Sequence, residues 1–237
     1  MIQPAEIPQA TVARLPLYLR ALAAMTAAGA TTVSSKTLAA RTGVNGANVR
    51  KDLAHLGTLG TRGAGYGAEV LLGAISSVLG VGEDRPLVIV GVGNLGRALA
   101  QYEGFSSRGF RVAGLFDTDP SKAGEAIAGV RIADPATLEC FAGAVRPVIG
   151  VIAVPGYAAQ NVADLMVAVG IASILNFAPS VIQVPEGVLV RQVDLATELQ
   201  ILGFYHRHRE LAPEPGPQAQ PGSESQCLSA HSPTQST

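Results

Sequence analysis

The residues with the clearest chemical potential in this chain form a glycine-rich loop, GVGNLG, at positions 91–96. The loop follows LVIV at 87–90, an apolar run typical of a buried strand, and leads into an expected helix over 95–104. In that setting Gly91 permits the tight turn, Gly93 lets the backbone approach a pyrophosphate, and Gly96 allows the helix to pack closely on the strand. The spacing predicts a dinucleotide site; the alternative is a strand-to-helix turn that holds no ligand.

An acidic residue stands where the second strand of such a site would end. The segment FRVAGLFD at 110–117 reads as that strand, and Asp117 can accept hydrogen bonds from the adenosine ribose hydroxyls. A carboxylate there would repel a 2′-phosphate, so we expect NAD(H) to be preferred over NADP(H). Asp119 is a weaker candidate for the same role, and the nearby Lys122 leaves the preference open.

Groups suited to hydride-transfer chemistry are scarce, although reduction of a carbonyl usually needs a proton donor beside the nicotinamide. No histidine lies between His55 and His206, and Lys122 is the only lysine of the expected nucleotide-binding region. Tyr157 is followed four residues later by Asn161 rather than by lysine. We therefore expect a sensor rather than an enzyme, and we assign no catalytic or metal-ligating residue. An NAD-dependent oxidoreductase and an architectural DNA-binding protein remain the alternatives.

A segment upstream of the loop is patterned for contact with DNA. Leu15, Leu19 and Leu22 recur at helical spacing, and a short helix over 36–42, a tight turn and a helix over 46–56 follow. The third helix has an apolar face of Val49, Leu53 and Leu56. The other side of this helix presents side chains that can contact bases or phosphates: Asn48, Arg50 and Lys51. The alternative is a plain three-helix module with a solvated charged face.

The flanks of these helices strengthen the interpretation as a winged helix-turn-helix. Ser34 or Ser35 can cap the short helix and hold a phosphate. Residues 57–67 contain five glycines and read as a hairpin wing, with Arg62 placed to enter a minor groove and Tyr66 packing behind it. Residues 1–80 carry seven Lys/Arg against three Asp/Glu, an excess of +4 in a chain whose net charge is −1. This local excess suits a DNA-contacting head.

The remaining pattern predicts an α/β protein with an N-terminal winged helix-turn-helix, a Rossmann-like parallel sheet and a C-terminal dimerisation helix. The expected parts are a DNA-binding domain at 1–82, a nucleotide-binding domain at 83–193, the helix at 194–210 and a disordered tail at 211–237. Apolar runs at 148–154 and 172–177 flank a helix over 158–169. Cys140 lies in an expected core region. The absence of a signal sequence or membrane span favours a soluble, cytoplasmic protein.

The last helix carries an apolar stripe of Leu195, Leu199 and Leu202, which needs a partner surface. That surface is either the chain's own sheet or a second subunit.

Taken in order, several segments resemble the Rex family of redox-sensing transcriptional repressors over about residues 7–205. These are VSSKTLAARTGVNGANVRKDL, LGTRGAGYG, VGVGNLGRALAQYEGF, FDTDP, VPGYAAQNVADL, ILNFAPSVIQVP and VDL. The resemblance implies a homodimer that binds a palindromic double-stranded DNA operator when NADH is low and leaves it when NADH binds. NADH and NAD⁺ would thus be regulatory ligands.

The resemblance also implies roles for residues at matching positions. DNA contacts would come from Ser34, Ser35, Asn48, Arg50, Lys51, Arg62, Gly63 and Tyr66. The adenosine and pyrophosphate would be held by Gly91, Gly93, Asn94, Leu95, Gly96 and Asp117. The nicotinamide side would be lined by Tyr102, Val154, Pro155, Asn176, Phe177, Ala178 and Pro179. We further expect Arg20 and Asp194 to act as switch partners between subunits.

The chain departs from the family pattern at three places. His55-Leu56 and Leu59 replace the aromatic residues usually found before the wing, and Gly156-Tyr157 replaces smaller or plainer residues at the pocket rim. Asp194-Leu195 stands where the family often has Asp-Phe.

Overall fold

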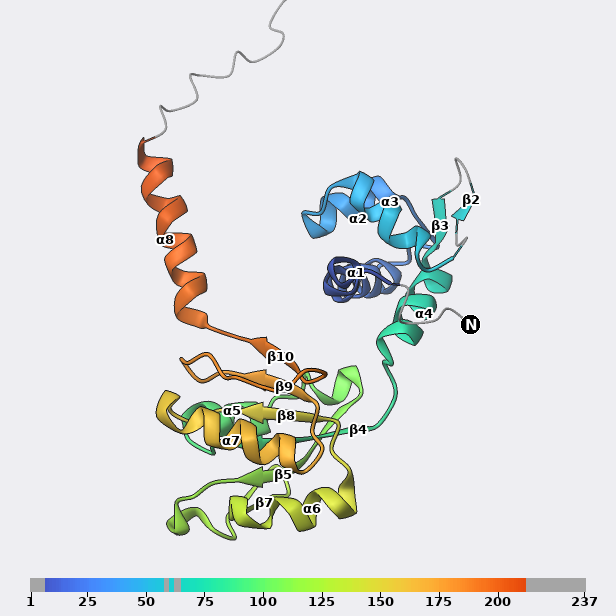
Figure 1. Ribbon diagram of the computed structural model, residues 1–237. Helices are drawn as coiled ribbons and strands as arrows, with labels where there is room; N and C mark the ends of the chain where they lie inside the picture. The colour runs from blue at the N-terminus through green and yellow to red at the C-terminus, as the bar shows by residue number, and fades with distance from the viewer. Residues whose placement is uncertain (1–6, 58–59, 62–64, 212–237) are drawn as a thin grey trace, which may run out of the picture. The chain divides into compact units, whose positions relative to one another are not determined.

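The computed structural model describes residues 7–57, 60–61 and 65–211 (Figure 1). The chain divides into two compact units, Met1–Val193 and Asp194–Thr237, which are described separately. The expected tail beyond Leu211 and the wing residues Arg62 and Gly63 lie outside the described residues, as does Leu59. No helix in the described ranges has the length and apolar character needed to cross a membrane.

The N-terminal part is a helical module joined to a small antiparallel sheet of order β1-β3-β2. Its elements are α1 (Gln9–Ala27), β1 (Thr32–Val33), α2 (Ser35–Thr42), α3 (Gly46–Ala54), β2 (Gly60–Thr61), β3 (Gly65–Gly67) and α4 (Ala68–Leu79). The four helices and Val33 of β1 share one hydrophobic core, to which α1 gives Leu15 and Leu22 and α3 gives Val49 and Leu53, and Tyr66 packs at its margin.

Local signals explain the turn between α2 and α3. Ser34 caps α2 by accepting a hydrogen bond from the backbone N–H of Thr37, and Gly43 ends the helix in the left-handed conformation. Asn45 caps α3 through the backbone N–H of Ala47. The expectation that α3 reaches residue 56 is wrong by two residues. The N–H groups of His55 and Leu56 bond three residues back, which tightens the last turn.

The part of the first unit that follows α4 contains a sheet of order β10-β9-β8-β4-β5-β7-β6. The strands are β4 (Arg85–Val90), β5 (Phe110–Phe116), β6 (Ala126–Ile127), β7 (Val130–Ala133), β8 (Ile149–Ile152), β9 (Ser173–Asn176) and β10 (Leu189–Gln192). All neighbours pair in parallel except β6 and β7. Numbered from β4 and without β6, the parallel strands follow the Rossmann order 3-2-1-4-5-6. β4 therefore stands at the point where the strand order reverses.

Apolar cores cover both faces of this sheet. Side chains of β4 alternate between them, since Val88 and Val90 face one core and Leu87 and Ile89 the other. The helices are α5 (Asn94–Ala100), α6 (Leu138–Val145) and α7 (Gly156–Ala168), with short 3₁₀ turns η2 (Ser106–Arg108), η3 (Pro120–Lys122) and η4 (Pro135–Thr137). α6 and α7 pack in the Val88 core and α5 in the Leu87 core.

Two expectations about this part are wrong. The helix after the glycine loop ends at Ala100 rather than at 104, because the chain turns where the N–H of Tyr102 bonds the carbonyl of Leu99. Cys140 is exposed on α6 and is not a core residue.

The second unit contains α8 (Leu195–Leu211). Asp194 precedes it and accepts hydrogen bonds from the backbone N–H groups of Ala196 and Thr197 and from the Thr197 hydroxyl. The carboxylate therefore caps the helix.

Candidate functional site

The glycine loop leaves β4 in a conformation that only glycine accommodates well. Gly91 has a φ of +96°, and a Cβ there would lie 2.5 Å from the carbonyl oxygen of Ala153. A Cβ on Gly96 would collide with the carbonyl oxygen of Gly91. A Cβ on Gly93 would meet nothing within 4 Å, so this glycine borders open space. Gly91 and Gly96 thus allow close packing, and Gly93 leaves room for a ligand.

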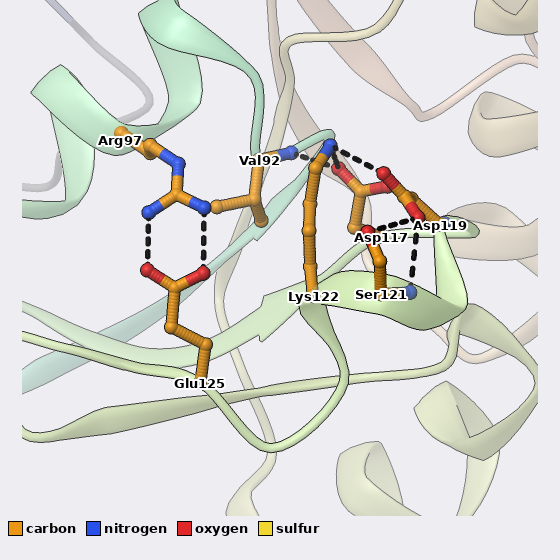
Figure 2. Close-up of polar contacts among 7 residues, drawn as sticks. All are labelled: Val92, Arg97, Asp117, Asp119, Ser121, Lys122 and Glu125. Atoms are coloured by element: carbon orange, nitrogen blue, oxygen red, sulfur yellow. Dashed lines mark hydrogen bonds and ion pairs between the residues drawn. The ribbon is translucent and has the colours of Figure 1, made fainter.

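Asp117 is tied directly to that loop (Figure 2). Its Oδ2 accepts a hydrogen bond of 2.7 Å from the backbone N–H of Val92, and its Oδ1 accepts one from the N–H of Asp119. Lys122 Nζ lies 3.0 Å from Oδ2. Burial alone would raise the pKa of Asp117, but these hydrogen bonds outweigh it and hold the pKa below its usual value. The carboxylate is therefore ionised beside the loop, and because it has about four acceptor sites, it can still accept a bond from a ribose hydroxyl.

An ion pair that the sequence did not reveal lies at the same end of the site. Arg97, on α5, directs both terminal nitrogens at the two carboxylate oxygens of Glu125, and Nη2 lies 2.6 Å from Oε2 (Figure 2). Glu125 is 28 positions along the chain and precedes β6, so no local spacing pattern links the two residues.

Several residues expected at the nicotinamide end are brought together where β8 and β9 end. Val154 borders Gly91, and the hydroxyl of Ser180 donates to the carbonyl of Gly156 at 3.2 Å, which joins the 154–156 and 176–180 loops. Asn176 is buried, and its amide nitrogen donates to Gln192 and to the carbonyl of Ser180. Through these hydrogen bonds, Asn176 stabilises the 177–180 loop.

Tyr102, a further residue expected at the nicotinamide end, lies in the turn that follows α5. Tyr102 is 53% exposed, and its ring packs edge-on against Phe105. It borders a groove of about 450 Å³ whose apolar wall includes Leu87, Val151 and Leu175. Phe177 packs in the same core as Phe105, and the described lining of the groove includes no residue of the 154–156 or 176–180 loops.

The expected DNA-reading helix presents its polar side chains as predicted. Asn48, Arg50 and Lys51 are exposed on α3, whereas Val49 and Leu53 are buried. Ser34 is exposed, and its hydroxyl is engaged in the α2 cap. These positions leave the outer face of α3 open to a groove of DNA.

A buried carboxylate holds α3 against α1. Asp52 is fully buried and accepts hydrogen bonds from the Thr11 hydroxyl, from the Tyr18 hydroxyl and, twice, from the Arg14 guanidinium, at 2.6–2.8 Å. Burial would raise the pKa of Asp52, yet the bonds from Arg14, Tyr18 and Thr11 hold it below its usual value. The burial and the Asp52 bond together raise the pKa of Tyr18. The sequence signal for this network is an acidic residue on the apolar face of the helix over 46–56.

The linker between the two parts is anchored by Arg85. Its Nη2 donates to the carbonyl oxygen of Leu79 at 2.7 Å and to that of Gly80, at the end of α4. Its guanidinium also lies 4.5 Å from the centroid of the Phe110 ring on β5.

The switch and dimer candidates lie in both units. Arg20 is exposed on α1, and Asp194 caps α8. The apolar side chains of α8 (Leu195, Leu199, Ile201, Leu202, Phe204 and Tyr205) are 45–68% exposed in the single chain.

Comparisons with known proteins agree with this geometry. Residues 6–54 match a family model described as "Putative DNA-binding protein N-terminus", and residues 83–180 match the CoA binding domain. The redox-sensing transcriptional repressor Rex of Streptomyces coelicolor is 57% identical over 86% of this chain and 79% of its own. That of Pelotomaculum thermopropionicum is 46% identical over 84% of this chain and 93% of its own. The chain belongs to the Rex family of redox-sensing transcriptional repressors.

Solved structures support the same assignment. A crystal structure of RSP in complex with beta-NAD⁺ and operator DNA has a TM-score of 0.81 and 34% identity, covering 86% of this chain and 94% of that one. RSP in complex with beta-NADH gives a TM-score of 0.80 at 32% identity, covering 87% and 97%. These relatives confirm the prediction of a transcriptional regulator rather than an enzyme. They do not support the two alternatives, an NAD-dependent oxidoreductase and an architectural DNA-binding protein.

Proposed function

We propose that this protein is a homodimeric repressor that binds a palindromic operator and is released from it by NADH. The observation that carries the proposal is that the DNA-binding head and the nucleotide-binding sheet, in one unbroken order, match RSP, which has been crystallised with operator DNA and with NADH. The family's bacterial members and the DNA target favour action in the cytoplasm.

The nucleotide would lie across the carboxyl ends of β4, β5 and β8. Gly91, Gly93 and Gly96, with Asn94 and Leu95, would hold the pyrophosphate, and Asp117 would accept bonds from the adenosine ribose. The Val92 bond supports this role, since it holds the Asp117 carboxylate against the glycine loop. The nicotinamide would face the loops that contain Val154-Pro155 and Phe177-Ala178-Pro179.

The redox signal would arise from charge. NAD⁺ carries a cationic nicotinamide and NADH a neutral one, and an apolar surface disfavours the cation. A ligand shifts the equilibrium between DNA-bound and free conformations only if its affinity for the two differs. An apolar surface beside Tyr102 and Phe177 would supply that difference.

The dimer would use α8, whose apolar side chains are exposed in the single chain. Two heads related by a two-fold axis would then meet two operator half-sites in the major groove, through Asn48, Arg50 and Lys51 with Ser34 and Ser35. The wing residues Arg62, Gly63 and Tyr66 would contact the flanking DNA. Arg20 of one subunit and Asp194 of the other would form an ion pair in one of the two conformations, DNA-bound or free, and would separate in the other.

The test is fluorescence anisotropy at fixed salt with an operator selected from random sequence, titrated separately with NADH, NAD⁺ and NADPH. We expect release at far lower NADH than NAD⁺ or NADPH. Equal release by NADH and NAD⁺, or binding that ignores both, would contradict the proposal. Arg20→Ala belongs in the same titration, and an unchanged DNA affinity together with an unchanged NADH response would remove the Arg20–Asp194 switch.

A further inference from the structure

The Arg97–Glu125 ion pair occupies a position where it contributes little to folding. The side chains are 37% and 44% exposed. Ion pairs with this much solvent contact typically contribute no more than about 1 kcal/mol to stability. Its location is more informative, since Arg97 follows the last glycine of the loop and interacts electrostatically with Asp117.

The pair belongs to a cluster of charges around the expected adenosine ribose (Figure 2). Three carboxylates, Asp117, Asp119 and Glu125, face two cations, Lys122 and Arg97, which leaves a net charge of −1. Both cations are engaged: Lys122 lies 3.0 Å from Asp117 and 3.7 Å from Asp119, and Arg97 is held in the two-point contact with Glu125.

This arrangement bears on how the site tells NADH from NADPH. Lys122 partly neutralises Asp117, so Asp117 alone is a weak barrier to a 2′-phosphate. Arginine is the side chain best suited to binding phosphate, because its planar fork matches two phosphate oxygens. An unpaired Arg97 beside Lys122 would therefore attract the extra phosphate of NADPH.

We infer that Glu125 is a specificity-determining residue that withholds Arg97 from a 2′-phosphate and so restricts the site to NAD(H). The inference rests on the proposed binding of NAD(H). Glu125 acts by occupying both terminal nitrogens of Arg97 and by keeping the cluster negative. Removing its charge brings the cluster to a net charge of zero and frees the guanidinium.

The experiment compares the dissociation constants of NADH and NADPH for the full chain and for Glu125→Gln, by calorimetric titration at low salt. The readout is the ratio of the two constants, because a merely structural defect would weaken both nucleotides in parallel. Because the freed Arg97 would make one charge-assisted contact with the 2′-phosphate, we expect the ratio of the two constants to shift in favour of NADPH. The shift should be on the order of tenfold to a hundredfold. We also expect NADPH to release operator DNA from the variant.

Two further variants sharpen the test. Glu139→Gln removes the same charge from an exposed position on α6 and should leave the ratio unchanged. Glu125→Gln combined with Arg97→Gln should lose the gain in NADPH affinity, since the gain depends on the guanidinium. Glu125→Ala repeats the measurement if Glu125→Gln is not recovered folded.

The outcomes separate this inference from the function on which it rests. If NADH still binds Glu125→Gln and the ratio does not move, Glu125 has no part in selectivity, while the redox-sensing proposal stands. If the gain survives removal of Arg97, the attraction comes from elsewhere and the inference fails. If the unmodified protein binds neither nucleotide, both proposals fall.

Discussion

Asp52 offers the sharpest test of how α3 is held in place. Replacing it by Asn keeps the size and shape of the side chain but removes its charge and one of its two acceptor oxygens. In the structure, each of the two oxygens accepts two hydrogen bonds. The amide nitrogen of Asn donates and cannot accept, so the two hydrogen bonds to whichever oxygen it replaces are lost.

The expected cost follows from these contacts. A hydrogen bond to a charged group contributes about 1.5–3 kcal/mol, and breaking a buried ion pair costs about 3–5 kcal/mol. Arg14 is 28% exposed, so water can recover part of its lost interaction. We therefore expect Asp52→Asn to lower the free energy of unfolding of the head by about 3 kcal/mol.

Hydrogen exchange measured by mass spectrometry reads this loss where it occurs. Amides of α1 and α3 should exchange on the order of a hundredfold faster in Asp52→Asn, and amides of β8 and β9 should not change. Glu69→Gln removes an exposed carboxylate from the same part of the chain and should have little effect. An acceleration of less than about threefold in α1 and α3 would refute the reasoning, because it would mean that Arg14 and Tyr18 find equal partners without Asp52.

The pH dependence of stability independently tests whether the charge of Asp52 stabilises the fold. The pKa of Asp52 is lower in the folded protein than its usual value near 4. Its contribution to stability is therefore complete above about pH 4 and disappears as the pH falls through the folded-state pKa. The stability difference between the unmodified protein and Asp52→Asn should shrink in acid; a difference that stays constant down to about pH 2 would show that the Asp52 charge is not its source.

Two further variants test the ligand site and the dimer. Gly96→Ala places a Cβ against the carbonyl oxygen of Gly91, so we expect NADH affinity to fall at least tenfold in calorimetric titration while operator binding persists; unchanged affinity would mean that the loop does not hold the nucleotide. Leu199→Asp puts a charge on the exposed apolar stripe of α8, so sedimentation should show a shift toward monomer and anisotropy a loss of operator affinity; a variant that stays dimeric would remove α8 from the interface.

Local patterns predicted the elements that bury apolar surface. The strands before and after the glycine loop, the cap at Ser34 and the buried face of α3 all follow from spacing within a few residues. In the seven-stranded sheet, the strands that escaped prediction are β6, β7 and β10, which lie at or beside its edges. β10 is mostly exposed and alternates weakly, so its composition does not distinguish it from a loop.

The site was predictable where its chemistry depends on backbone shape, and not where it depends on contacts between distant segments. The glycines and Asp117 have fixed positions relative to a strand and a helix. The Arg97–Glu125 pair and the Asp52 network join residues 28 and 34–41 positions apart. Which cation forms an ion pair with each carboxylate can be seen only in the folded structure.

The position of Arg85 constrains how a nucleotide could affect the head. Arg85 begins β4 and holds the carbonyl oxygens that end α4, whereas the other end of β4 leads into Gly91. A strand of six residues spans about 20 Å and is stiff along its length, so the glycine loop and the end of α4 are joined by one rigid element. Both NAD⁺ and NADH would place the same pyrophosphate on that loop, and contacts they share cannot distinguish them. The difference between the two ligands would therefore originate where the nicotinamide lies, and β4 would transmit to α4 only a difference that the nicotinamide end of the site produces.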